Sequence, residues 1–111
     1  MKKLLCASSS VVEGASIGLA SEEVGSQDIF VVRRDGNLFA YINSCPHTGV
    51  ELNWQPDAFL DVEGFYIQCA VHGARFEVET GRCVWGPCAN QSLSPVSVCE
   101  ENNQIWMLGE S

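Results

Sequence analysis

The sequence predicts an all-β fold, a small antiparallel sandwich or barrel. Short apolar stretches alternate with turn residues along the chain, two hairpin signals stand out, and no long stretch has the period of a helix. The chain has 111 residues, of which 46% are hydrophobic and 18% charged, which is typical of one globular domain. Its uninterrupted apolar runs are only a few residues long, so we expect a soluble protein without a transmembrane helix.

Two hairpins frame this prediction. Residues 30–34 and 38–42 are rich in β-branched and aromatic side chains, and Asp35-Gly36-Asn37 between them accepts positive φ. Residues 96–99 and 104–108 flank Glu101-Asn102-Asn103, a second turn of suitable composition. The other expected strands are 4–6, 16–20, 65–68, 75–78 and 83–85, and short helical turns are conceivable at 8–13 and 55–60.

The charge balance limits the partners. Fourteen Asp and Glu residues against six Lys and Arg give a formal charge of −8, which opposes general binding to nucleic acid or anionic membranes and favours a basic partner. Met1–Cys6 places two lysines and two leucines before a cysteine, but its apolar stretch is too short for a secretory signal. We therefore expect an opening strand and a cytoplasmic protein.

The six cysteines are too few to indicate a disulfide scaffold. In a reducing compartment, some would be metal ligands and the rest buried thiols. The only two histidines each stand beside a cysteine, in Cys45-Pro46-His47 and Cys69-Ala70-Val71-His72. Each pair follows an expected strand and leads into a glycine, so two loops at strand ends carry four soft or borderline metal ligands.

Two kinds of metal site suit these ligands. Two thiolates and two imidazoles can hold a tetrahedral zinc ion, which would make the protein a zinc-stabilised interaction module. The single residue between Cys45 and His47 is tight for two ligands of one small ion, however. It is comfortable if the pair binds two metals, as in a two-iron, two-sulfide cluster with both thiolates on one iron and both imidazoles on the other.

The two loops resemble the C-x-H and C-x-x-H cluster-binding loops of Rieske iron–sulfur domains. The similarity covers residues 45–52 and 69–76 and continues through Glu79-Thr80-Gly81 and Gly86-Pro87-Cys88, which resemble the family's hairpin turn and proline loop. The resemblance implies one [2Fe-2S] cluster, with Cys45 and Cys69 on one iron and His47 and His72 on the other. The long gap between His47 and Cys69 predicts an extra loop over residues 53–64.

The resemblance also implies a fold and a function. We expect a single domain, residues 1–111, in which an inserted cluster-binding lobe of about residues 44–90 sits on a β base formed by about 1–43 and 91–111. The function would be one-electron transfer by a soluble ferredoxin, which is not itself an enzyme, from a flavin reductase to an oxygenase or similar acceptor. The alternative within the family is the small subunit of a larger redox enzyme, such as nitrite reductase with its large subunit. No histidine remains for the second iron site of an oxygenase.

The reduction potential is expected in the lower part of the Rieske range of roughly −150 to +300 mV. High-potential members resemble C-T-H-x-G-C and C-P-C-H-G-S-x-Y, where a disulfide joins the loops and two hydroxyls donate to sulfur. The matching positions here are Val50, Val71, Ala74 and Phe76. Both hydroxyls are missing, so the negative charge of the reduced state loses two hydrogen-bond donors.

The remaining chemistry-bearing residues are interpreted more simply. Cys83 and Cys88 are expected to be buried or half-buried thiols, and Gly81 an ordinary turn residue. Core positions are expected for Cys6, Cys99, Trp85 and Trp106, and a partner contact is conceivable for Trp54. The acidic residues around the first loop form either a docking field for a basic reductase or a solvated face; they are Glu51, Asp57, Asp61 and Glu63.

Overall fold

The computed structural model describes residues 2–19, 28–44, 52, 57, 59–61, 64–69, 73–86 and 91–108. Over these residues the chain forms ten strands and one 3₁₀ turn: β1 (Lys2–Ala7), η1 (Ser8–Ser10), β2 (Ser16–Leu19), β3 (Ile29–Arg34), β4 (Asn37–Ile42), β5 (Ile67–Gln68), β6 (Arg75–Phe76), β7 (Cys83–Trp85), β8 (Pro95–Val96), β9 (Val98–Glu101) and β10 (Gln104–Leu108). This confirms the all-β, antiparallel expectation.

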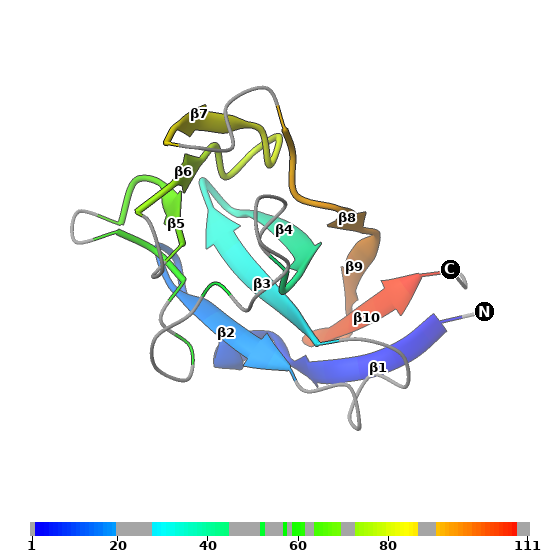
Figure 1. The fold of residues 1–111 in the computed structure, drawn as a ribbon. Helices are drawn as coiled ribbons and strands as arrows, with labels where there is room; N and C mark the ends of the chain where they lie inside the picture. The colour runs from blue at the N-terminus through cyan, green and yellow to red at the C-terminus, as the bar shows by residue number, and fades with distance from the viewer. Residues whose placement is uncertain are drawn as a thin grey trace.

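The strands form three antiparallel sheets (Figure 1), with strand orders β1-β10-β9, β2-β3-β4-β8 and β5-β6-β7. The third sheet lies between β4 and β8 in the sequence. After it, β8 returns to the edge of β4 and pairs Ala40 with Val96 and Tyr41 with Pro95. The third sheet is thus an excursion from one edge of the second, at the opposite end of the molecule from β1 and β10.

Strand β3 is covered on both faces, and its sequence shows why. Ile29, Phe30, Val31 and Val32 are each at most 2% exposed. Because successive side chains of a strand point to opposite faces, Ile29 and Val31 enter one core while Phe30 and Val32 enter another. A strand buried on both faces needs a continuous apolar run, which is what the sequence has here.

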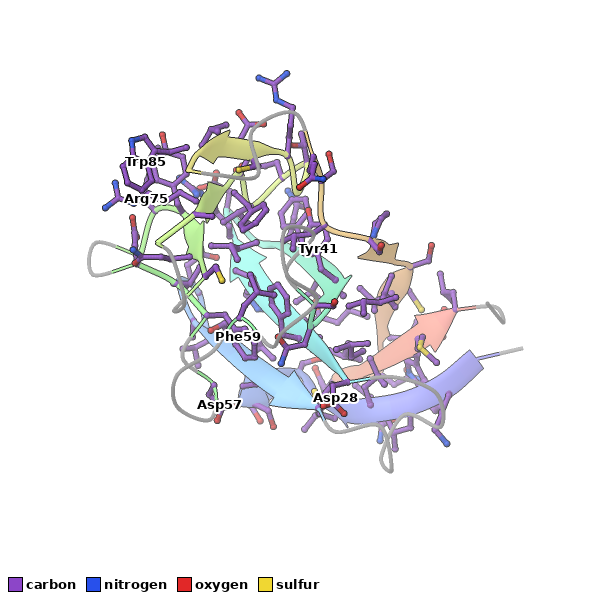
Figure 2. The ribbon with its side chains drawn as sticks, viewed as in Figure 1. Asp28, Tyr41, Asp57, Phe59, Arg75 and Trp85 are labelled. Atoms are coloured by element: carbon purple, nitrogen blue, oxygen red, sulfur yellow. The ribbon has the colours of Figure 1, made fainter. Side chains whose placement is uncertain are left out.

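The two cores are defined by their members. The base core lies between the first and second sheets and contains Val11, Leu19, Ile29, Val31, Ala40 and Ile105. The loop core lies between the second and third sheets and contains Phe30, Val32, Tyr41, Leu52, Phe59, Ile67, Cys69, Ala74, Phe76, Val78, Cys83 and Leu93. Tyr41 and Phe59 project into this second space (Figure 2).

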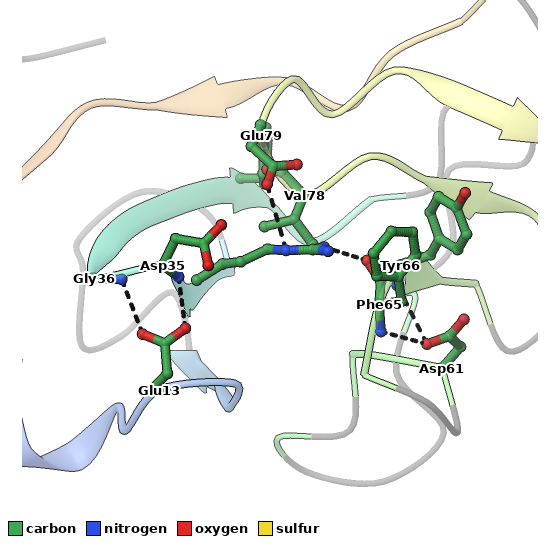
Figure 3. Close-up of polar contacts among 10 residues, drawn as sticks. Glu13, Asp35, Gly36, Asp61, Phe65, Tyr66, Val78 and Glu79 are labelled. Atoms are coloured by element: carbon green, nitrogen blue, oxygen red, sulfur yellow. Dashed lines mark hydrogen bonds and ion pairs between the residues drawn. The ribbon is translucent and has the colours of Figure 1, made fainter.

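Both predicted hairpins form with two-residue loops. Arg34 pairs with Asn37, and the φ angles of Asp35 and Gly36 between them are 54° and 79°. The Glu13 carboxylate accepts hydrogen bonds from both turn amides, at 2.6 and 2.9 Å, which lower the pKa of Glu13 (Figure 3). The second loop is Asn102-Asn103, whose φ angles of 53° and 62° are the left-handed values that asparagine tolerates.

Other elements are shorter than expected. Of the strand expected at 65–68 only β5 forms, and of that at 75–78 only β6. The helical turn expected near residues 8–13 is the 3₁₀ turn Ser8–Ser10, and half of residues 55–60 lie outside the described residues. No helix in the described part of the chain is long and apolar enough to cross a membrane.

Two residues in the middle of the expected extra loop are held against β2 and β3. The Asp57 carboxylate accepts a hydrogen bond from the Gly18 amide at 2.7 Å, and the Asp57 carbonyl accepts one from the Ser16 hydroxyl at 2.9 Å. The Phe59 ring stacks on Phe30 with centroids 4.4 Å apart and an interplanar angle of 7°. The second half of this loop therefore contributes an aromatic anchor to the loop core.

Candidate metal centre

The second of the two predicted ligand loops is the tip of the β5–β6 hairpin. Cys69 directly follows β5, and only 1% of its surface is exposed. Its amide donates to the Ala74 carbonyl at 2.8 Å, and its own carbonyl accepts from the Gly73 amide at 2.9 Å. These two bonds join Cys69 to Gly73 and Ala74 across the hairpin, so the backbone fixes where the Cys69 thiol enters the core.

The first ligand loop is bracketed by Asn43 and Leu52. The Asn43 amide donates to the Asp28 carbonyl at 2.9 Å, and its side-chain oxygen accepts from the Leu52 amide at 2.8 Å. Leu52 is fully buried in the loop core. Asn43 therefore connects the start of this loop, just after β4, to the residue that follows it.

Of the four predicted ligands, the described residues include only Cys69. Cys45, His47 and His72 lie outside them, as do Cys88 and Trp54, so their predicted roles stay predictions. The structure does place the flanks of both loops in one core, because Leu52, Cys69 and Ala74 are all members of the loop core. In the described residues no group of three His, Cys, Asp or Glu side chains comes together.

Two glycines lie at the hairpin tip or against it. A Cβ on Gly86 would lie 2.8 Å from the Ala74 Cα, so the start of the predicted proline loop rests directly on the backbone of the second ligand loop. Gly73 has a φ of 71°, and a Cβ there would lie 3.7 Å from Cζ3 of Trp85. A side chain at Gly86 would push these two loops apart.

The expectation that Trp85 is a core residue is wrong, since it is 60% exposed. It ends β7, the edge strand of the third sheet, and neighbouring Val84 is 38% exposed. Figure 2 shows the Trp85 ring beside Arg75, at the outer side of the third sheet. The Arg75 guanidinium carbon lies 5.7 Å from the ring centroid, within cation–π range, and the two residues are a cross-strand pair.

The other cysteines behave largely as expected. Cys83 is 4% exposed, belongs to the loop core, and its Sγ lies 3.4 Å from the Trp85 carbonyl. Cys6 and Cys99 are only partly buried, and so is Trp106, so their core roles are partial. Of the acidic residues, the Asp57 and Asp61 carboxylates accept backbone hydrogen bonds, which makes them structural as well as charged.

Arg34 ties the segment before β5 to the turn after β6 (Figure 3). Its guanidinium donates to the Phe65 carbonyl, stacks 4.3 Å above the Phe65 ring and pairs with Glu79 at 3.4 Å. The Asp61 carboxylate in turn accepts from the Phe65 and Tyr66 amides at 2.9 and 3.2 Å. The hairpin that carries Cys69 is thus fixed at its base as well as at its tip.

Comparison with known proteins decides what this arrangement is. A family model described as the Rieske [2Fe-2S] domain matches residues 1–101, nearly the whole chain. The chain belongs to the Rieske [2Fe-2S] family. A relative, the ferredoxin component of the p-cumate 2,3-dioxygenase system of Pseudomonas putida, is 32% identical over 104 residues, which cover 93% of this chain and 81% of that relative.

Solved structures agree with this Rieske assignment. The ferredoxin of carbazole 1,9a-dioxygenase from Nocardioides aromaticivorans IC177 has the same fold, with a TM-score of 0.78, 21% identity and 99% coverage of both chains. A chain from a complex of reduced oxygenase and oxidized ferredoxin in carbazole 1,9a-dioxygenase has a TM-score of 0.77 and 25% identity, over 98% of this chain and 94% of that one.

The family assignment fixes the cofactor class. This Rieske protein binds a [2Fe-2S] cluster and carries single electrons, and it is not itself a catalytic enzyme. The described residues fit such a cluster, because the Cys69 thiol is a soft metal ligand that is buried at the tip of a closed hairpin. The family also decides against the zinc-stabilised module that the Cys and His spacing left open.

Proposed function

We propose that Cys45 and Cys69 bind one iron of the cluster and that His47 and His72 bind the other. This assignment rests on the position of the two loops relative to the loop core. Leu52, at the end of the first loop, and Cys69, at the start of the second, are both buried in that core. When bound, the cluster accepts and returns one electron. The protein's own contribution is to bring four ligands from two loops together and to hold at least one of them away from water.

The closed hairpin sets the surroundings of Cys69. Two backbone hydrogen bonds, Cys69 amide to Ala74 carbonyl and Gly73 amide to Cys69 carbonyl, hold the loop, and the buried side chains of Ala74 and Phe76 keep water out. In high-potential relatives the corresponding positions carry hydroxyl groups. Apolar, buried residues in their place support a reduction potential in the lower part of the Rieske range.

We infer that the electron donor is a flavin reductase and the acceptor an oxygenase. The Pseudomonas putida relative is named as the ferredoxin component of a dioxygenase system, and a structural neighbour comes from an oxygenase–ferredoxin complex. Such names favour a separate carrier over the small subunit of a larger enzyme such as nitrite reductase. A cytoplasmic location is proposed because cysteine ligands and buried thiols need a reducing compartment.

The domain organisation is proposed on the same basis. The third sheet belongs to the cluster-binding lobe, about residues 44–90, which packs on the β base through the loop core, and the base core lies within the β base. The return of β8 to the edge of β4 supports an insertion between residues 43 and 91.

The ligand assignment is tested by anaerobic purification, iron and sulfide analysis, and absorption and EPR spectra before and after dithionite. Cys69→Ala and Cys83→Ala form a matched pair, because both cysteines are buried in the loop core, at 1% and 4% exposure. We expect Cys69→Ala to lose the cluster and Cys83→Ala to keep both the cluster and its reduced-state signal. A full cluster in Cys69→Ala, or its loss only in Cys83→Ala, would reject the assignment.

The carrier function is tested separately by stopped-flow reduction. The loaded protein should be reduced by a flavin reductase with NADH and then reoxidised by an oxygenase component in the presence of its substrate. Reduction by dithionite without reoxidation by any oxygenase would leave the cluster assignment intact and reject the proposed acceptor.

A further inference from the structure

We propose that Trp85 and Arg75 form the anchor on which the oxygenase docks, and that the oxygenase presents a carboxylate beside an apolar surface to them. This inference rests on the proposed function and adds the residues and the chemistry of the contact. The surface is defined here as the Trp85 ring and the Arg75 guanidinium.

The first observation is the exposure of Trp85. Single exposed apolar residues are common on protein surfaces, but a tryptophan that leaves 60% of its surface in water is a large apolar area. Val84, next to it on the same edge strand, is 38% exposed. Tryptophan and arginine are the residue types most often found at the energetic centre of protein interfaces.

The second observation is the position of the ring. Its Cζ3 atom lies 3.7 Å from where a Gly73 Cβ would stand, so the ring lies beside Gly73, at the hairpin tip that begins at Cys69. Electron transfer slows exponentially with distance, so an acceptor must approach this tip closely. An acceptor that does so meets Trp85.

The third observation is the charge of Arg75. In the described part of the chain, Arg33 pairs with Glu100 and Arg34 with Glu79, whereas Arg75 has no carboxylate within ion-pair distance. Its guanidinium is held 5.7 Å from the Trp85 ring centroid and is otherwise open to solvent. In a chain of formal charge −8, this is a local positive site that complements an acidic side chain.

The partner side of the contact follows from these features. The Arg75 guanidinium lies 5.7 Å from the ring centroid, so a group that brings a carboxylate to it from the ring side also covers the indole. The contact then removes an aromatic face from water. Exclusion of water also strengthens the ion pair between the partner's carboxylate and the Arg75 guanidinium. A uniformly basic partner surface would be attracted to the protein as a whole but repelled at this point.

The test measures binding of the loaded protein to the oxygenase component of the p-cumate 2,3-dioxygenase system of Pseudomonas putida by calorimetry. We expect Trp85→Ala to raise the Kd about thirtyfold, Trp85→Phe to retain most of the affinity, and Arg75→Gln to raise the Kd about fivefold. Arg82→Gln is the matched control. It removes one cation from an exposed position of the same region and should change the Kd less than twofold.

Folding and function are controlled in the same experiment. Trp85 and Arg75 are exposed, so both variants should keep the cluster absorption and the far-UV circular dichroism of the parent protein. Three results would overturn the anchor and leave the carrier function standing. They are an unchanged Kd for Trp85→Ala, an equal change of Kd for Arg75→Gln and Arg82→Gln, and weaker binding only to the reductase component of that system. Failure of the wild-type protein to bind or reduce the oxygenase would instead reject the acceptor, and the anchor with it.

Discussion

Replacing Gly81 with alanine should destabilise the protein more than its turn position alone explains. Gly81 has a φ of 76°, and a Cβ there would lie 2.6 Å from Cε1 of Tyr41 and 3.2 Å from Cδ1 and Cζ. The ring cannot easily move away, because Tyr41 is 3% exposed and its hydroxyl donates to the Val78 carbonyl at 2.7 Å. Burial and the charges of Glu79 and Glu77 raise the pKa of Tyr41 to about 12, so the hydroxyl stays protonated and remains a donor well above neutral pH.

The magnitude has two parts. Alanine in the left-handed region costs about 1–2 kcal/mol. Forcing a methyl group against a fixed buried ring costs about 1–3 kcal/mol more, in shifted packing or a strained hydrogen bond. We therefore expect a loss of about 2–5 kcal/mol for Gly81→Ala. Gly36→Ala is the control, since Gly36 has a φ of 79° but no atom within 4 Å of an added Cβ.

The assay is urea unfolding of the loaded protein followed by far-UV circular dichroism. The contribution of cluster loss is common to both variants and cancels in the difference between their free energies of unfolding. Gly81→Ala should be less stable than Gly36→Ala by about 1–3 kcal/mol. Equal losses would refute the steric reasoning and return Gly81 to the role of an ordinary turn residue.

Three further outcomes are expected. The Arg33 guanidinium donates hydrogen bonds to the Glu100 carboxylate and lowers its pKa from 4.5 to about 2. The ion pair therefore stabilises the fold fully above about pH 4.5, and this contribution is lost as the pH falls toward 2. The thermal midpoint should fall less steeply over that pH range in Glu100→Gln than in the wild type, and parallel curves for the two proteins would contradict this. Ala74→Ser should raise the reduction potential by about 60 mV if its hydroxyl donates to a ligand sulfur, as measured by spectroelectrochemistry. His72→Cys should lower the potential, because it adds a negative ligand to the second iron; an unchanged potential with an intact cluster would show that His72 is not a ligand.

Local sequence signals predicted the β framework well. The turn residues Asp35-Gly36 and Asn102-Asn103 determine both hairpins, because positive φ at two successive positions is a property of the residues themselves. The apolar run of β3 likewise indicated a buried strand. The C-x-H and C-x-x-H spacing predicts the family without knowledge of the fold, because the ligands of each loop lie within a few residues of one another in the sequence.

Contacts between distant residues could not be predicted in this way. The bond from the Leu52 amide to Asn43, the Tyr41 ring over Gly81 and the Gly86 contact with Ala74 each join segments whose relative position depends on the whole fold. The strand-like neighbours of Trp85 predict a core position. The sequence does not show that this strand lies at the edge of a three-stranded sheet, where one face stays in water.

The two cores are mechanically linked through β3 and β4. Phe30 and Val32 face the loop core while Ile29 and Val31, one position away, face the base core. On β4, Ala40 and Tyr41 divide in the same way. Neither core can open without exposing one face of these shared strands, so the seating of the ligand loops depends on the integrity of the base. A large-to-small substitution that creates a cavity in the base core should therefore weaken binding of the cluster, even though the base core and the ligand loops lie on opposite faces of the second sheet.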